Sequence, residues 1–257
     1  MDLLLSNKVA IVTGASRGIG KAIAESLSAE GMRVVLVARS RQGLESLAKS
    51  LPNESLVQAF DLRESDSANQ VVARTLGKFN RLDLLVNNAG ATKRGDFLTL
   101  TDEEWADGFA LKFYAAMHLS RAAWPYLQAV KGGIINIIGI GGRTGSAEFT
   151  IGGAVNAALM NLTKALADRG IRDGIRVNAI NPGSIATERL QTRIRKYAEE
   201  KDIDAVEAAQ RLPREMKIGR FGEPAEIARG VAFLASSQAA YVQGAILDVD
   251  GGATRTL

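Results

Sequence analysis

The chain contains no cysteine, which excludes disulfide bonds, thiolate catalysis and cysteine-ligated metals. No apolar run approaches the roughly 18–20 residues that span a bilayer, and the opening MDLLLSNKVAIVTG lacks the basic start of a signal peptide. Basic blocks are absent too, because 32 basic and 28 acidic residues are spread along the chain. We therefore predict a cytoplasmic protein without a metal site that binds neither membrane nor nucleic acid.

The apolar pattern of the 257 residues indicates an α/β protein. Short apolar runs predict strands at residues 8–14, 33–38, 56–61, 82–90, 133–139, 175–183 and 245–252. Helical spacing predicts helices at residues 20–31, 41–50, 65–79, 102–130, 152–169, 188–211 and 224–236. This alternation implies one parallel sheet covered on both faces. We find no repeat or linker, so we predict a single domain over residues 1–257.

A glycine-rich stretch, TGASRGIG at residues 13–20, lies between the first predicted strand and the first helix. Glycines there allow a tight turn and let the backbone approach a pyrophosphate, whose charge suits the helix N-terminus. The strand–turn–helix context makes the motif specific for a dinucleotide. The alternative is a generic glycine turn.

The stretch ARSR at the end of the second predicted strand indicates which dinucleotide, NAD or NADP, the chain binds. A carboxylate at this point would bind the ribose 2′-hydroxyl of NAD. The chain has Arg39 instead, and Arg17 in the glycine turn points to the same region. Two guanidiniums suit a 2′-phosphate, so we predict NADP(H) as cofactor. The alternative is that both arginines are simply solvated.

With these motifs, the chain resembles the short-chain dehydrogenase/reductase family over nearly its whole length. The resemblance is carried by the following stretches: TGASRGIG (13–20), DL (61–62), NNAG (87–90), NPGSIAT (181–187), GRFGEPAEIA (219–228) and LDVDGG (247–252). It implies a Rossmann-type, doubly wound parallel sheet with strand order 3-2-1-4-5-6-7. It also implies a homotetramer built on the two long helices and the last strand, and a small-molecule substrate.

The turn, the arginines and the resemblance together give the expected cofactor-binding residues. The resemblance implies adenine contacts at residues 61–62, ribose contacts at 88–90 and nicotinamide contacts at 182–187. The full set is Gly14, Ser16, Arg17, Gly18, Ile19, Gly20, Arg39, Asp61, Leu62, Asn88, Ala89, Gly90, Lys112, Pro182, Gly183, Ile185 and Thr187.

The family's catalytic asparagine, serine, tyrosine and lysine are all expected at positions where this chain has other residues. By resemblance, Gly139 takes the serine position and Gly152 the tyrosine position. Asn156 takes the lysine position, and Lys112 takes the asparagine position. Asparagine and lysine have thus exchanged places. We hypothesise that Lys112 and Asn156 retain ribose contact and cofactor positioning; equally, Lys112 could be a solvated or interface lysine.

No comparable replacement exists for the serine and tyrosine, since two glycines offer no donor and are expected to leave a void. A positioned general acid contributes roughly 10²–10⁴ in rate. The polar residues Ser146, Glu148 and Thr150 and the possible anion holder Arg143 lie nearby in sequence, but each is expected to be structural.

Two other features have structural interpretations. The string YAEEK, Tyr197 to Lys201, has the family's tyrosine–lysine spacing but lies on the wrong element, so we expect an exposed amphipathic helix. His118, the only histidine, is expected at a packing or interface position.

Three functions follow from these observations. The favoured one is an NADP(H)-dependent oxidoreductase with a non-standard site that acts on a carbonyl or alcohol. The alternative is an inactive NADP(H)-binding sensor or scaffold, and a different reaction on the same fold is the third. Residues 188–217 are expected to cover the substrate. They are rich in arginine, which would suit an acidic or acyl-carrier-linked substrate or simply a solvated surface.

Overall fold

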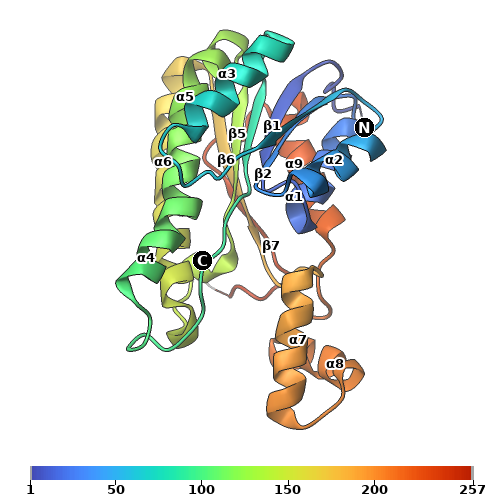
Figure 1. The fold of residues 1–257 in the computed structure, drawn as a ribbon, viewed down its shortest axis with the longest axis vertical. Helices are drawn as coiled ribbons and strands as arrows, with labels where there is room; N and C mark the ends of the chain where they lie inside the picture. The colour runs from blue at the N-terminus through green and yellow to red at the C-terminus, as the bar shows by residue number, and fades with distance from the viewer. Residues whose placement is uncertain (1, 256–257) are drawn as a thin grey trace.

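The computed structural model describes residues 2–255. Seven parallel strands form one sheet in the order β3-β2-β1-β4-β5-β6-β7, which confirms the predicted topology (Figure 1). The strands are β1 (Val9–Thr13), β2 (Arg33–Ala38), β3 (Ser55–Ala59), β4 (Leu84–Asn87), β5 (Gly133–Ile137), β6 (Arg176–Pro182) and β7 (Ile246–Val249). Strands β2 and β3 are added on one side of β1, and β4 to β7 are added on the other side. The connections therefore change direction between β1 and β4, and a ligand-binding crevice is expected there at the carboxyl edge of the sheet.

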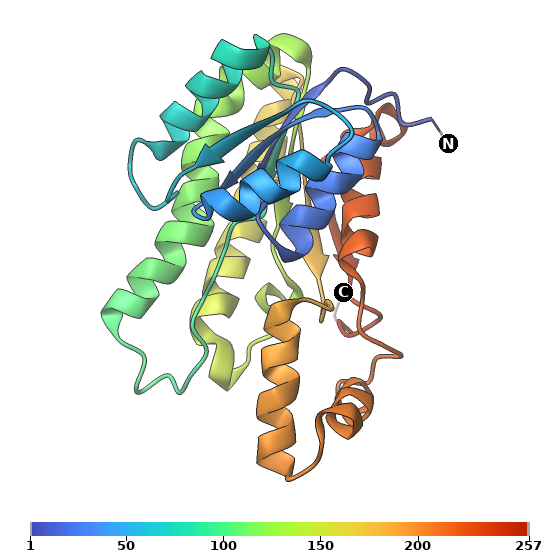
Figure 2. The same cartoon turned by 45° about the vertical axis from the view of Figure 1, so that its right-hand side comes forward.

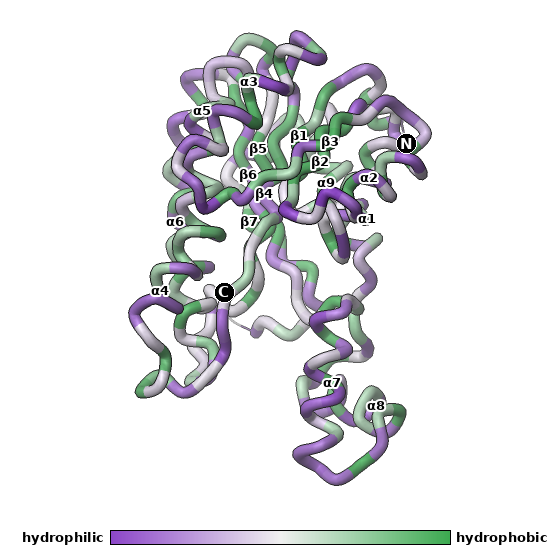
Figure 3. The backbone as a smooth tube through the Cα atoms, in the orientation of Figure 1, coloured by the Kyte–Doolittle hydropathy of each residue, from purple (hydrophilic) through white to green (hydrophobic). Residues whose placement is uncertain are grey.

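Helices cover both faces of the sheet, as the alternating pattern predicted. One face carries α1 (Gly18–Ala29), α2 (Arg41–Ser50) and α9 (Pro224–Ala235), and the other carries α3 (Ser67–Phe79), α5 (Ala115–Val130) and α6 (Thr150–Asp173) (Figure 1). The central strands are buried and apolar because both of their faces are covered (Figure 3). The packed sheet therefore gives a rigid base for the residues at its carboxyl edge.

Two departures from the predicted elements lie beside that edge. The expected helix over 188–211 is two helices, α7 (Glu188–Lys201) and α8 (Ala205–Glu215). The break occurs where Asp202 takes a left-handed conformation and the Asp204 side chain caps α8 by accepting from two backbone N–H groups. Figures 1 and 2 both show this pair projecting beyond the sheet.

The second departure is in the long helical region predicted over 102–130. It is built from α4 (Asp102–Phe109) and α5, joined by a π-helical turn at Ala110–Tyr114. π-Helical turns inside α-helices occur frequently at functional sites. Among the described residues, no helix is both long and apolar enough to cross a membrane.

Candidate functional site

The glycine turn at residues 13–20 leads from β1 into α1, as predicted. Gly14 and Gly18 have φ angles of +67° and +56°, which side-chain-bearing residues rarely adopt. A Cβ at Gly20 would overlap the carbonyl oxygen of Gly14. Arg17 is the N-cap of α1, and its side chain does not cap the helix. The turn therefore leaves the first N–H groups of α1 available to an anion.

The segment after β4 is fixed to this turn by hydrogen bonds. The backbone N–H groups of Asn88 and Ala89 both donate to Thr13 Oγ1 at 2.9 Å. The Asn88 side chain donates to the Thr13 carbonyl at 2.9 Å. The structure thus brings Asn88, Ala89 and the following Gly90 beside the glycine turn.

The predicted nicotinamide segment also returns to the glycine turn. Gly183, directly after β6, donates its N–H to the Val249 carbonyl at 3.1 Å, and Ile185 pairs with Gly222. Thr187 is the N-cap of α7, and its methyl group lies in contact range of Gly18. The three segments predicted to hold a dinucleotide therefore border one edge of the sheet.

The two predicted phosphate-binding arginines lie at different points of this edge. Arg17 forms an exposed ion pair with Glu188, its Nη1 lying 2.8 Å from Oε2. Arg39 is exposed after β2, and its guanidinium contributes to lowering the pKa of Asp61. Exposed ion pairs contribute only about 0–1 kcal/mol, so Arg17 can exchange Glu188 for a phosphate at little cost.

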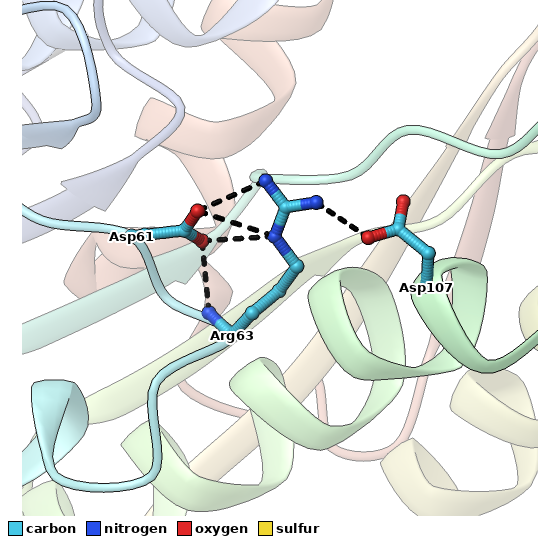
Figure 4. A network of polar contacts seen from close by, with 3 residues as sticks. All are labelled: Asp61, Arg63 and Asp107. Atoms are coloured by element: carbon cyan, nitrogen blue, oxygen red, sulfur yellow. Dashed lines mark hydrogen bonds and ion pairs between the residues drawn. The ribbon is translucent and has the colours of Figure 1, made fainter. Parts of the chain in front are cut away.

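Asp61 belongs to a network that the sequence did not indicate (Figure 4). The Arg63 side chain donates to both carboxylate oxygens of Asp61, at 3.0 Å from Nε and 2.9 Å from Nη2, and this lowers the pKa of Asp61. Arg63 also pairs with Asp107 on α4. The expected adenine contacts at Asp61 and Leu62 are therefore fixed to the helix that leads to Lys112.

Lys112 lies in the π-helical turn between α4 and α5. Its Nζ donates to the carbonyl of Ile138, just after β5, at 2.5 Å. The methylene groups pack on Gly90, where a Cβ would lie 3.0 Å from Lys112 Cδ. Burial lowers the pKa of Lys112 to about 7, and the Arg189 guanidinium lowers it in the same direction.

Asn156 reaches the same end of β5 from α6. Its side chain is buried, and a Cβ at Gly139 would lie 3.2 Å from its Nδ2. The Asn156 Oδ1 atom is buried with no hydrogen-bond partner among the described residues. The structure thus brings Lys112 and Asn156 together at residues 138–139.

The two glycines at the expected serine and tyrosine positions differ in their surroundings. Gly139 has a φ angle of +131° and donates its N–H to Asn181 Oδ1 at 3.3 Å. Gly152 lies against the Phe149 ring, which a Cβ at this position would overlap. The expected void at Gly152 is therefore wrong, because the aromatic ring fills it. The ring is covered in turn by Arg94, whose guanidinium carbon lies 4.0 Å from the ring centroid.

The other polar candidates have structural roles or face solvent. Arg143 pairs with Asp248 at 3.0 Å, so it is not free to hold an anion. Ser146 and Glu148 are exposed, and Thr150 Oγ1 is buried without a partner among residues 2–255.

The remaining two features of the sequence lie away from the site or face a neighbour. Tyr197 lies on the buried side of α7, where its hydroxyl donates to Glu215 at 2.5 Å, and the other side of this helix is exposed, which agrees with the expected amphipathic helix. His118 stacks on Tyr114, which agrees with a packing position. No cluster of His, Asp and Glu suited to a metal ion occurs within the described range.

Sequence reasoning missed Phe149 and Arg94 as site residues. Phe149 ends a short 3₁₀ turn before α6, and Arg94 lies four residues after Gly90. Neither position has a periodic pattern around it. Their only sequence signal was proximity to the ends of β4 and β5.

Comparison with known proteins identifies the family. Residues 14–254 match the family profile described as enoyl-(acyl carrier protein) reductase. The chain is 34% identical over 249 residues to 3-oxoacyl-[acyl-carrier-protein] reductase FabG of Haemophilus influenzae, covering 96% of this chain and 98% of the relative. It is also 34% identical over 249 residues to the acetoacetyl-CoA reductase of Rhizobium meliloti, with the same coverage.

Solved structures show the same likeness. L-sorbose reductase from Gluconobacter frateurii, in complex with NADPH and L-sorbose, superposes with a TM-score of 0.94 and 35% identity over the full length of both chains. A variant of actinorhodin polyketide ketoreductase with NADPH gives a TM-score of 0.92 at 32% identity, covering 97% of this chain and 98% of that one. The protein therefore belongs to the short-chain dehydrogenase/reductase family of oxidoreductases.

Proposed function

We propose that the protein is an NADP(H)-dependent oxidoreductase with a non-standard active site that interconverts a carbonyl and an alcohol. The observation that carries the proposal is the meeting of Lys112 and Asn156 beside the cofactor cradle at the end of β5. A lysine with a pKa of about 7 is a group that gains and loses a proton near neutral pH.

The residues present fit an NADP(H) molecule. The glycine turn offers the N–H groups of α1 to a pyrophosphate, and the crowding at Gly20 leaves room for no side chain there. Arg17 and Arg39 provide guanidiniums for a 2′-phosphate, and no carboxylate follows β2 to select a 2′-hydroxyl. When bound, the dinucleotide supplies or accepts the hydride.

Lys112 performs the proton chemistry in this proposal. One of its three N–H donors is held by the Ile138 carbonyl, which leaves two for a ribose hydroxyl and for the oxygen of the reacting carbonyl. Nζ donates a proton as the carbonyl becomes an alcohol and accepts one in the reverse direction. Burial makes this proton transfer possible because it lowers the pKa of Lys112 to about 7, whereas a solvated lysine keeps its proton at neutral pH.

Asn156 positions Lys112 and the ligand rather than reacting. Its buried Oδ1 lacks a donor among the described residues, and such an atom is costly unless a ligand or water satisfies it. A ribose hydroxyl or a water bound to the lysine ammonium would supply that donor. This agrees with the exchange of asparagine and lysine noted in the sequence.

One observation favours the alternative, an inactive NADP(H)-binding sensor or scaffold. The Phe149 ring occupies the place of a tyrosine side chain and provides no hydroxyl. Calorimetry with NADPH and NADH, followed by a screen of carbonyl compounds at the NADPH absorbance band, distinguishes the two functions. Tight binding without NADPH oxidation by any carbonyl would support the sensor and contradict the enzyme.

Variants test the individual roles. We expect R39Q to weaken NADPH binding about tenfold or more and to leave NADH binding unchanged, since a charge-assisted contact contributes roughly 1.5–3 kcal/mol. R229Q, on the exposed face of α9, is the matched control. K112A should weaken NADPH binding and abolish turnover. Unchanged NADPH affinity in K112A would contradict the ribose contact, and tighter binding of NADH than of NADPH would contradict the cofactor assignment.

A further inference from the structure

Three arginines lie close enough to influence one another near the ends of β4 and β6. Arg189, in the first turn of α7, donates from Nη2 to the Gly90 carbonyl at 3.1 Å. Arg193, one turn further along α7, lies with Nη1 3.5 Å from Ser184 Oγ. α7 thus places one guanidinium on the segment that packs on Lys112 and a second beside the segment after β6.

Arg94 comes from the loop that follows β4. Its guanidinium stacks on Phe149 at 4.0 Å, and the loop that carries it is held where the Gly95 N–H donates to the Glu148 carbonyl at 3.2 Å. Stacking fixes the plane of a guanidinium while leaving its N–H edges free for an in-plane acceptor. Among the described residues, the Arg94 side chain donates to no acceptor. It is therefore an oriented cation with unused donors.

The charges of these arginines are not balanced by carboxylates. The ion pairs of the described chain use other arginines, such as Arg17 and Arg143, and none involves these three. Glu148 partly offsets the charge of Arg94 without pairing with it. Burial lowers the pKa of Arg94, and the positive charges of Arg193 and Arg189 lower it further.

We propose that Arg94, Arg193 and Arg189 form a subsite for an oxyanion, so that the substrate is a carbonyl compound carrying a carboxylate or phosphate group. This rests on the proposed function, because it places the reacting carbonyl near Lys112 and the anion on the far side of Phe149. A planar guanidinium edge matches the two oxygens of either group. L-Sorbose, bound by the similar reductase, is a neutral sugar, so the subsite would set this chain apart.

Arg189 is also close enough to Arg17 for that guanidinium to lower its pKa, so Arg189 borders the cofactor end of the site. Arg94 and Arg193 are therefore the residues that test the subsite. Arg195, exposed on α7 and bonded to Thr192 Oγ1 at 3.4 Å, is a matched control with the same charge on the same helix.

The test is calorimetry on the full chain, with and without NADPH, using paired probes. The first pair is 4-oxopentanoate and its methyl ester, and the second is dihydroxyacetone phosphate and dihydroxyacetone. We expect one or both anions to bind at least tenfold more tightly than their neutral partners. R94Q and R193Q should each reduce anion affinity about tenfold without changing that of the neutral probes, and R195Q should leave both unchanged.

The two pairs identify whether the subsite prefers carboxylate or phosphate, and a preference for either supports it. Equal affinity for charged and neutral probes, no binding of either anion at millimolar concentration, or equal losses in R195Q would overturn it. Arginine-dependent anion binding, together with no NADPH oxidation by any carbonyl of the screen described above, would retain the subsite and reject the proposed enzyme. Oxidation of NADPH by neutral carbonyls alone would do the reverse.

Discussion

The pKa of Lys112 predicts a specific pH dependence of stability. The substitution K112M removes the titrating group and keeps a flexible side chain of similar length. The pKa of about 7 in the folded state lies below the ordinary lysine pKa of 10.5, which applies to the unfolded chain. Between these values the unfolded chain holds a proton that the folded chain has released. The stability of the wild type relative to K112M must therefore rise as the pH increases through this window.

The size of the effect follows from the two values. Below pH 7 both states are protonated and the cost of burying the ammonium is constant, so K112M should be the more stable protein there. Above pH 7 the difference in free energy of unfolding between K112M and the wild type decreases by up to about 1.4 kcal/mol per pH unit. Between pH 6 and 9 the full shift corresponds to a relative change of about 2–3 kcal/mol, and solvent reaching the half-buried side chain would reduce it to roughly 1–2 kcal/mol.

Urea unfolding of both proteins without cofactor at pH 6, 7, 8 and 9 measures this change. The packing difference between lysine and methionine shifts the free energy of unfolding equally at every pH, so only the slope reports the titration. K21M, which removes an exposed lysine of α1, shows how far any lost cation alters the profile. Parallel profiles for the wild type and K112M would refute a buried ammonium with a pKa near neutrality.

Three further predictions concern the surroundings of Lys112. We expect G152Y alone to lower the melting temperature because its Cβ overlaps the Phe149 ring, at a cost of about 1–3 kcal/mol or more; calorimetric scans should show F149A/G152Y to be more stable than G152Y, and the opposite order would contradict the overlap. G139A should cost roughly 1–3 kcal/mol in urea unfolding because φ is +131°, and an unchanged midpoint would rule out this strain. R63Q should lower the free energy of unfolding by about 1 kcal/mol and weaken NADPH binding, and D107N should weaken NADPH binding less. Equal NADPH affinity in the wild type, R63Q and D107N would show that the Asp61–Arg63–Asp107 network does not support cofactor binding.

Much of the fold was predictable because its elements have strong local signals. The strand order came from the family resemblance, and the apolar runs correctly predicted a parallel sheet buried on both faces. Boundaries were less certain where local signals conflict. The helix predicted over 188–211 breaks at Asp202 because the Asp204 side chain offers α8 a cap that helical periodicity does not reveal.

The site was predictable where backbone turns and neighbouring elements define it. The glycine turn, Asn88 and Gly90 follow from strand ends that must share one edge of the sheet. The sequence did not predict the position of the Phe149 ring. A ring folding back over α6 depends on the geometry of a 3₁₀ turn, and no periodic pattern specifies such a turn.

The surroundings of Gly139 and Gly152, the positions expected for serine and tyrosine, bear on the two proposed functions. Random loss of a tyrosine would leave a cavity, and cavities in packed regions are destabilising. Here a ring fills the space at Gly152, a guanidinium covers that ring, and the Lys112 stem packs on Gly90. Neighbouring side chains therefore fill the space at these positions. Such filling of space suits both proposed functions, an oxidoreductase with a non-standard site and a cofactor-binding protein without turnover. The Asn156 Oδ1 atom lacks a hydrogen-bond partner among the described residues, and a ligand that satisfies both this oxygen and the Lys112 ammonium would explain why the two side chains are buried here. A bound cofactor ribose meets that need in an enzyme and in a sensor alike, so the turnover screen decides between them.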